Sequence, residues 1–158
     1  MRLFLQQQHL PTGLLRPSLL RPLYRSLRAA GRIADVDPDA ETSILLTNDE
    51  GIALLNSQFR GIDRPTDVLS FPQEDDLLLG DIVISMETAQ RQAARADWPF
   101  SSEVALLGVH GLLHLLGWDD ESLEGAQEME TFTRTVLTAS QIDMPGDEHP
   151  FFRSFLEQ

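Results

Sequence analysis

The stretch Glu103–Ser122 reads EVALLGVHGLLHLLGWDDES and predicts the helix around which the rest of the chain folds. Its two histidines, His110 and His114, are four residues apart, so a helix places both side chains on one face. The neighbouring residues are almost all apolar, which is typical of a helix buried on every side. Two imidazoles in such surroundings need partners, because an unpaired buried polar group costs about 1–3 kcal/mol.

The residues after the second histidine supply further polar groups. Gly117 predicts the end of the helix, and Asp119 and Asp120 follow directly. Two imidazole nitrogens and a carboxylate oxygen form an accepted ligand set for catalytic zinc, with a fourth position left for water. Water held in this way ionises near neutral pH and acts as a nucleophile or base. Histidines at this spacing are a weak signal alone, so two hydrogen-bonded core histidines remain the alternative.

The histidine motif argues against two other classes of enzyme, starting with the zinc proteases. Their helix carries the pattern H-E-x-x-H, in which the glutamate after the first histidine is the general base. Gly111 stands at that position here, so peptide hydrolysis by the same route is disfavoured. An iron oxygenase with two histidines and a carboxylate is also disfavoured, because its ligands are spaced differently.

The composition is that of an ordinary soluble protein. A chain of 158 residues with 42% hydrophobic residues predicts one domain spanning 1–158. The acidic tail from about residue 143 is expected to be ordered only in part. Cysteine is absent, which excludes disulfides and thiolate ligands and fits a reducing compartment. No apolar run is long enough to span a membrane, so we expect a cytoplasmic protein.

The charge of the chain is distributed unevenly. The net charge is −13, which disfavours broad, non-specific binding to nucleic acid. The first 34 residues nevertheless contain six arginines and no acidic residue. This start resembles an organelle transit peptide, but its arginine spacing favours an amphipathic helix over 18–31. The arginine face is either solvated or a contact surface for RNA or an acidic partner. It comprises Arg21, Arg25, Arg28 and Arg32.

Hydrophobic periodicity and turn residues predict short strands interleaved with helices. The expected strands cover residues 1–8, 43–47, 67–71 and 77–85. The expected helices cover 18–31, a segment capped by Asn48 or Asp49 and ending near Phe59, 86–96, the histidine helix capped by Ser101 or Ser102, and 121–139. This order favours an α+β fold in which about five helices pack on a small mixed sheet. The metal site is expected on the buried helix and the turn that follows it.

Four short blocks between residues 48 and 130 are distinctive. They read LNSQFRG at Leu55–Gly61, PTDVLSFP at Pro65–Pro72, LGDIVIS at Leu79–Ser85 and HGLLHLLGWDD at His110–Asp120. In that order they resemble the motifs L-N-x-x-[FY]-R-G, P-T-D-V-L-S-F-P, L-G-D-I-V-I and H-G-x-L-H-L-x-G-Y-D-H of the YbeY family. This is a family of bacterial endoribonucleases and rRNA maturation factors. On these motifs the chain is identified as a member of the family.

The resemblance implies a fold, a metal and an activity. The fold is a mixed four-stranded sheet with surrounding helices, and the metal, usually taken as zinc, is held by three histidines. The activity is single-strand-specific RNA cleavage in 16S rRNA 3′-end maturation and ribosome quality control. The implied partners are therefore the 16S rRNA precursor and the small ribosomal subunit with its associated proteins. The family's arginine falls on Arg60, which we expect to be catalytic because a guanidinium binds phosphate bidentately; a structural salt bridge is the alternative.

The chain departs from the family pattern at one position. Asp120 stands where the family has its third histidine. We predict that His110, His114 and Asp120 bind Zn²⁺, with Mn²⁺ or Mg²⁺ as alternatives because a carboxylate favours harder metals. Asp119 or His149 would be the substitutes for Asp120, although Asp119 is rather expected to orient a ligand or to cap the turn.

Other polar residues near the motifs are expected either to support the site or to have structural roles only. These residues are Thr66, Asp67, Ser70 and Asp81. Of the remaining histidines, His9 and His149 are interpreted as surface residues.

The sequence leaves two functions open. The first is a metal-dependent endoribonuclease, in which the metal polarises the scissile phosphate or activates its water and Arg60 neutralises the developing charge. The second is a non-catalytic, ribosome-associated assembly factor in which the metal is structural. The negative net charge and the lack of an evident base favour the second function. No feature of the sequence indicates an oligomeric state.

Overall fold

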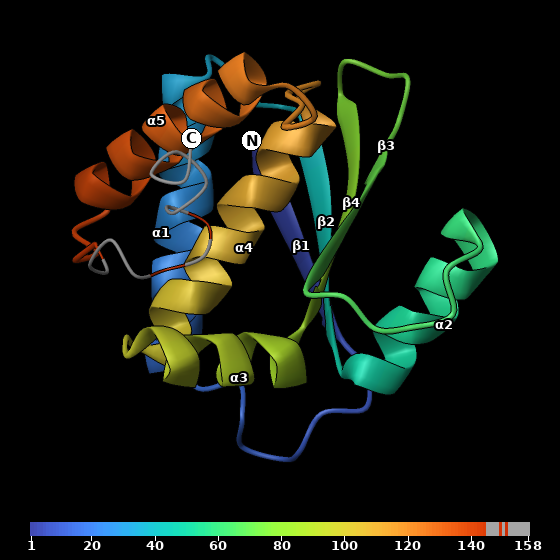
Figure 1. Cartoon of the computed structure of the whole chain (residues 1–158). Coiled ribbons are helices and arrows are strands. Elements are labelled where there is room, and N and C mark those ends of the chain that lie inside the picture. Colours follow the sequence, from blue (N-terminus) through green and yellow to red (C-terminus); the bar gives the residue numbers. More distant parts are fainter. Residues whose placement is uncertain (145–148, 150, 152–158) are drawn as a thin grey trace.

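The structure, a computed structural model, describes residues 1–144, 149 and 151. In chain order its elements are β1 (Arg2–Gln7), α1 (Pro17–Ile33), β2 (Glu41–Thr47), α2 (Asp49–Arg60), β3 (Val68–Pro72), β4 (Leu78–Ser85), α3 (Met86–Ala96), α4 (Phe100–Leu115) and α5 (Leu123–Ala139). The described part thus contains one mixed four-stranded sheet and five helices (Figure 1). The prediction of an α+β fold is confirmed.

The sheet has the strand order β1-β2-β4-β3. The first three strands are parallel, whereas β3 is antiparallel to β4 and lies at an edge. The consecutive residues Ile82, Val83 and Ile84 of β4 are all almost completely buried. Continuous apolar runs of this kind are typical of strands that are covered on both faces. The edge position of β3 also explains why a proline, Pro72, is tolerated at its end.

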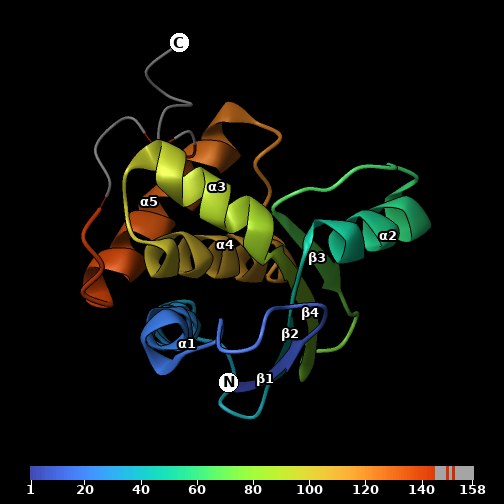
Figure 2. The same cartoon turned by 90° about the horizontal axis from the view of Figure 1, so that it is seen from below.

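Helices cover both faces of the sheet (Figure 2). α1 and α4 pack on one face, and α2 packs on the other. Alternate residues of β4 serve the two faces. Ile82 and Ile84 belong to the large core beneath α1 and α4, whereas Val83 packs with Ile52 of α2. Asp81 has the same parity as Val83 and is exposed, so it lies on the face away from α4.

α4 is the central helix, and its burial on nearly every side agrees with the prediction. Two glycines allow its neighbours to approach closely. A Cβ atom on Gly108 would overlap a methyl group of Leu23 in α1. A Cβ atom on Gly111 would lie 2.7 Å from Cγ2 of Ile82 in β4. Gly111 therefore faces the sheet, and a glutamate there would point into β4 rather than towards the histidine face.

Side-chain caps begin α2 and α5, and of these only the cap at Asn48 was predicted. The Oδ1 atom of Asn48 accepts a hydrogen bond from the N–H of Gly51 at the start of α2. Ser122 caps α5 in the same way, so this helix begins two residues later than predicted. α3 covers the predicted range.

The start of α4 contradicts the prediction of a serine cap. The helix begins at Phe100, and neither Ser101 nor Ser102 caps it. Pro99 occupies the cap position, with φ −60° and ψ 141°, and its carbonyl accepts from the N–H groups of Ser102 and Glu103. Because both serines already have helical backbone, their hydroxyl groups lie too far inside the helix to cap it.

The amphipathic helix predicted at 18–31 is α1, which is slightly longer. Leu19, Leu23 and Leu27 are buried, and the arginine face lines an open groove on the outside. Within the described ranges, no helix is long and apolar enough to cross a bilayer. Almost all of the acidic tail expected from about residue 143 falls outside the described residues.

Candidate metal centre

Three side chains converge at the C-terminal end of α4. The Nε2 atoms of His110 and His114 lie 2.9 Å apart. The Oδ2 atom of Asp120, from the turn after the helix, lies 3.8 Å from the first nitrogen and 3.9 Å from the second. A tetrahedral zinc ion with bonds of about 2.1 Å separates its ligands by about 3.4 Å. The three donors are therefore close to the spacing that a shared metal ion requires.

A turn of defined geometry holds His114 in place. Gly117 has φ +91°, a left-handed conformation that favours glycine and ends the helix where the sequence predicted. The N–H of Trp118 then donates to the carbonyl of Leu113, and the N–H of Gly117 donates to that of His114, which is the Schellman arrangement. The same turn places the Trp118 carbonyl oxygen 3.0 Å from Nδ1 of His114. Nδ1 must donate to that oxygen, so Nε2 carries the lone pair that can bind a metal.

The surroundings of His110 keep its imidazole neutral. Burial is the main reason why its pKa is lowered from the usual 6.5, and the charge of His114 lowers it further, while Asp120 and Asp67 act in the opposite direction. A neutral imidazole is the form that binds metals. Two ring nitrogens only 2.9 Å apart are compatible with a proton or a metal ion between them. The donor set therefore fits a divalent metal ion.

The two substitutes considered for Asp120 have other contacts. The Oδ1 atom of Asp119 accepts from the backbone N–H of Glu121, which makes Asp119 a turn-forming residue. His149 is only 4% exposed, and its Nε2 lies 2.7 Å from Oε2 of Glu103. The interpretation of His149 as a surface histidine was wrong, because its imidazole is buried against Glu103 of α4. His9 is exposed, as predicted.

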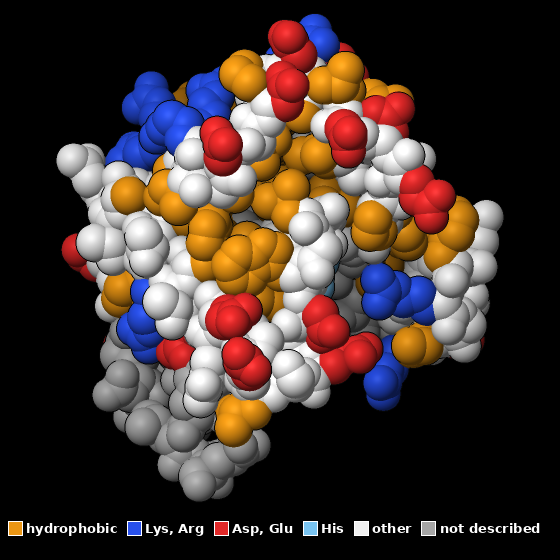
Figure 3. Space-filling view, turned by 90° about the horizontal axis from the view of Figure 1, so that it is seen from above, with side chains coloured by type: hydrophobic (Ala, Val, Ile, Leu, Met, Phe, Trp, Pro, Cys, Tyr) orange, Lys and Arg blue, Asp and Glu red, His pale blue; other side chains and the backbone are white. Residues whose placement is uncertain are grey.

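The three donors lie in a cleft of about 410 Å³ that also contains Arg60. Arg60 is the last residue of α2, and its exposed guanidinium donates from Nη2 to the carbonyl oxygen of Ser70, 3.3 Å away. A guanidinium has five N–H donors, so most of them remain available to a ligand. Figure 3 shows a hollow with a histidine at its floor, acidic side chains on one side and arginine on the other. The cleft is lined by Arg60, Asp67, Val68, Ser70, Pro72, His110, His114, Asp119, Asp120 and Glu121.

Of the remaining predicted residues, Ser70 lines the cleft, whereas Thr66 and Asp81 do not. The buried hydroxyl of Ser70 donates to the carbonyl oxygen of Gly111 at 3.0 Å, which ties β3 to α4 between the two histidines. The hydroxyl of Thr66 donates to the carboxylate of the neighbouring Asp67, and Thr66 is not among the described residues that line the cleft. Asp81 does not line the cleft either, and its exposed side chain lies on the face of the sheet away from α4.

Asp67 was predicted only as a possible supporting residue, and Glu103 was not predicted as a functional residue. The carboxylate of Asp67 accepts from the N–H of Val68 and from Nε2 of Gln92, and it lines the cleft beside His110. Glu103 is completely buried on α4. One signal was present in the sequence: Glu103 precedes His110 by seven residues, a spacing that places both on the same face of a helix.

Comparison with known proteins agrees with these features. The family model for Endoribonuclease YbeY matches residues 17–141. Endoribonuclease YbeY of Nitrobacter hamburgensis is 42% identical over 134 residues, which cover 78% of this chain and 70% of that protein. Endoribonuclease YbeY of Moorella thermoacetica is 42% identical over 145 residues, which cover 84% of this chain and 91% of that protein. The solution structure of a Thermotoga maritima protein matches with a TM-score of 0.57 and 27% identity, over 90% of this chain and 99% of that one.

These matches extend far beyond the four motifs from which the resemblance was drawn. They include α1 and α5, whose sequences carry none of the motifs. The resemblance is therefore confirmed: the chain belongs to the YbeY family.

Proposed function

We propose that the chain is a metal-dependent endoribonuclease that cleaves single-stranded RNA. The observation that supports this proposal most is the meeting of three metal-binding donors with one arginine in a single cleft. The relatives named above carry the name endoribonuclease. A cleft of about 410 Å³ accommodates one phosphodiester and its adjoining sugar rather than a duplex.

The charges of the cleft support a requirement for metal. Asp67, Asp119, Asp120 and Glu121 line it, whereas Arg60 is the one fixed cation among its described lining residues. A phosphodiester approaching these carboxylates would be repelled unless a divalent cation were bound. His110, His114 and Asp120 would hold that cation, which supplies Lewis acidity towards the phosphate and its attacking water.

The protein side chains have separate tasks in this mechanism. His114 is oriented by the Trp118 carbonyl, so its lone pair faces the cleft. Arg60 donates hydrogen bonds to the non-bridging oxygens as negative charge develops on them. The buried bond from Ser70 to Gly111 fixes β3, and with it the carbonyl that positions Arg60, against the histidine helix.

The biological substrate that we propose is the 3′ end of the 16S rRNA precursor on the small ribosomal subunit, where cleavage serves rRNA maturation and ribosome quality control. Activity is expected in the cytoplasm. With a net charge of −13, the chain is repelled by RNA as a whole, so docking needs a local basic surface such as the arginine face of α1.

Purified protein is expected to cleave an end-labelled single-stranded RNA from the 16S precursor, and to leave the same sequence intact when it is annealed into a duplex. Chelation should stop the cleavage and the returned metal should restore it, because the cleft cannot hold a phosphate without a cation. An RNA of unrelated sequence is the control for site preference. Stoichiometric metal without any cleavage would favour the assembly factor with a structural metal.

We propose Zn²⁺ as the resident metal, with Mn²⁺ or Mg²⁺ as competitors because Asp120 offers an oxygen donor. Asp120→His is expected to raise the share of zinc over manganese severalfold when both ions are supplied, since imidazole suits zinc better than manganese. Elemental analysis after equilibration with both ions measures this share. Asp81→His, at an exposed aspartate outside the cleft lining, is the matched control and should leave it unchanged. An unaltered share in the Asp120 variant would remove Asp120 from the ligand set.

A further inference from the structure

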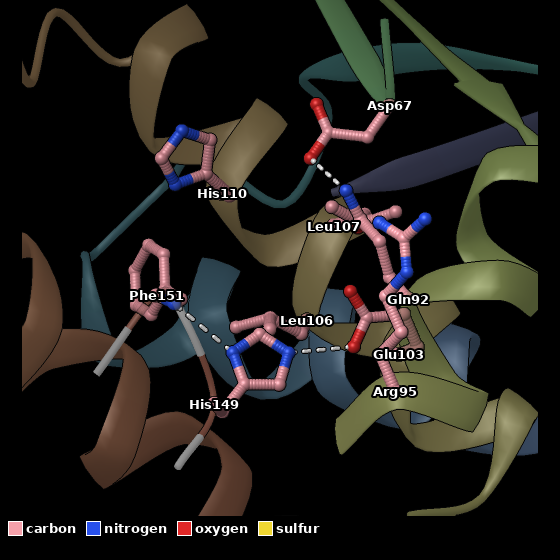
Figure 4. Close-up of a pocket in the computed structure, with 9 residues that line it drawn as sticks. All are labelled: Asp67, Gln92, Arg95, Glu103, Leu106, Leu107, His110, His149 and Phe151. Carbon is pink, nitrogen blue, oxygen red and sulfur yellow. Dashed lines mark hydrogen bonds and ion pairs between the residues drawn. The ribbon is translucent and has the colours of Figure 1, made fainter. Parts of the chain in front are cut away.

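A second cavity, of about 340 Å³, adjoins the metal cleft along the same face of α4 (Figure 4). The two hollows share His110 and Asp67. From His110 the cavity extends along the helix to Glu103, seven residues or about 10 Å away. Its lining consists of Asp67, Gln92, Arg95, Glu103, Leu106, Leu107, His110, His149 and Phe151.

Glu103 is one of the residues that line this cavity, and its carboxylate carries an unmatched acceptor. Its side chain is only 1% exposed. The Oε2 atom accepts from Nε1 of Trp98 at 2.7 Å and from Nε2 of His149 at 2.7 Å. The Oε1 atom is buried and has no hydrogen-bond partner among the described residues. Figure 4 shows it turned away from His149. A buried acceptor without a partner is costly, so a ligand with an N–H donor is favoured here.

The walls of the cavity favour a flat, partly apolar ligand. Leu106 and Leu107 form one wall, and the ring of Phe151 stands edge-on to that of His110 with 5.3 Å between centroids. Arg95 is exposed and brings a positive charge to the lining. Apolar and aromatic walls combined with hydrogen-bonding side chains are the usual way in which proteins hold an unpaired nucleobase.

We propose that this cavity binds an unpaired nucleobase that carries an amino group, next to the phosphate held in the metal cleft, and that Glu103 recognises the amino group. The inference rests on the proposed function, because it assigns a subsite to the RNA substrate. Cytosine, adenine and guanine each offer an amino group. Uracil has a carbonyl oxygen where cytosine has its amino group, and that oxygen would be repelled by the carboxylate.

Binding of cytidine and uridine tests the proposal without any cleavage, since neither nucleoside contains a phosphate. Trp98 is the reporter, because its indole N–H donates to the same carboxylate. In NMR titrations of the full chain at neutral pH, cytidine is expected to shift the indole N–H resonance of Trp98 and to bind about tenfold more tightly than uridine. Loss of the resonance in Trp98→Phe assigns it.

Glu103→Gln reverses the polarity of the proposed contact at constant shape. The amide oxygen keeps the bonds from Trp98 and His149, so the amide N–H₂ group takes the position of Oε1. There it can donate a hydrogen bond to the carbonyl oxygen of uridine, which it therefore favours. The cytidine preference should therefore vanish or invert. Glu124→Gln, an exposed change of the same kind on α5, should leave it intact. If Glu103→Gln does not fold, Phe151→Ala provides the second test: it should weaken both nucleosides, because it removes a wall.

The outcomes separate this inference from the proposed function. Cytidine selectivity that persists in His114→Ala supports the cavity whether or not RNA is cleaved. Equal affinity for the two nucleosides, a preference unchanged in Glu103→Gln, or the absence of any shift at Trp98 would overturn it, even if the protein proves to be a nuclease.

Discussion

Replacing His114 with alanine is expected to abolish stoichiometric metal binding and, with it, RNA cleavage. The variant retains only His110 and Asp120 of the three converging donors. It also loses the imidazole that the Trp118 carbonyl orients towards the cleft. Binding of a metal to the native state stabilises wild-type protein by about 4 kcal/mol at a thousandfold excess over Kd. The variant should lose this metal-dependent rise in Tm, measured by thermal unfolding with and without the ion.

The fold of the variant should survive, because α4 is held by its other faces. The side chain of His114 is 29% exposed, whereas the neighbouring Leu112 and Leu113 are completely buried in the core. His9→Asn is the matched control: His9 is exposed and has φ +60°, a conformation that asparagine tolerates. The control should bind one equivalent of metal by elemental analysis. One equivalent in His114→Ala would contradict the ligand assignment.

Local patterns explain what could be predicted from the sequence. Apolar residues on all sides of two histidines predicted a buried helix, and the helix is α4. Gly117 predicted its end because a left-handed residue there costs glycine little. The four-residue spacing of the histidines and the directly following turn made convergence with Asp120 foreseeable. Each of these inferences joins residues fewer than a dozen positions apart.

The errors and omissions arose from contacts between distant parts of the chain. Glu103 was seen only as part of a helix, because its partner His149 lies 46 residues further on. His149 was assigned to the surface for the same reason. Asp67 was left undecided, since its partner Gln92 lies in α3, 25 residues further along the chain. Local spacing contains no information about such pairs.

The metal cleft is assembled from both faces of the sheet, which explains why Arg60 depends on the fold rather than on the histidine helix. α2 packs on the face opposite α4, and its last residue reaches the cleft at the edge formed by β3. Gly61, with φ +69°, ends α2 directly after Arg60 and so fixes the position of the arginine backbone at the end of the helix. The ligand set and the arginine therefore belong to separate structural units, and they can be removed separately.

Arg60→Ala is expected to keep one equivalent of metal but to lower kcat for RNA cleavage by about 10²–10³-fold, as the loss of one donor to a developing oxyanion does. The side chain is exposed, and among the described residues it donates to one carbonyl, that of Ser70, so its removal should change Tm little. Arg60→Lys keeps the charge but not the planar fork, and an intermediate rate is expected.

Arg64→Ala, an exposed arginine outside the cleft lining, is the matched control and should cleave normally. Full activity in Arg60→Ala would remove Arg60 from the mechanism. Loss of the metal together with activity would instead make it a structural residue that supports the ligand set.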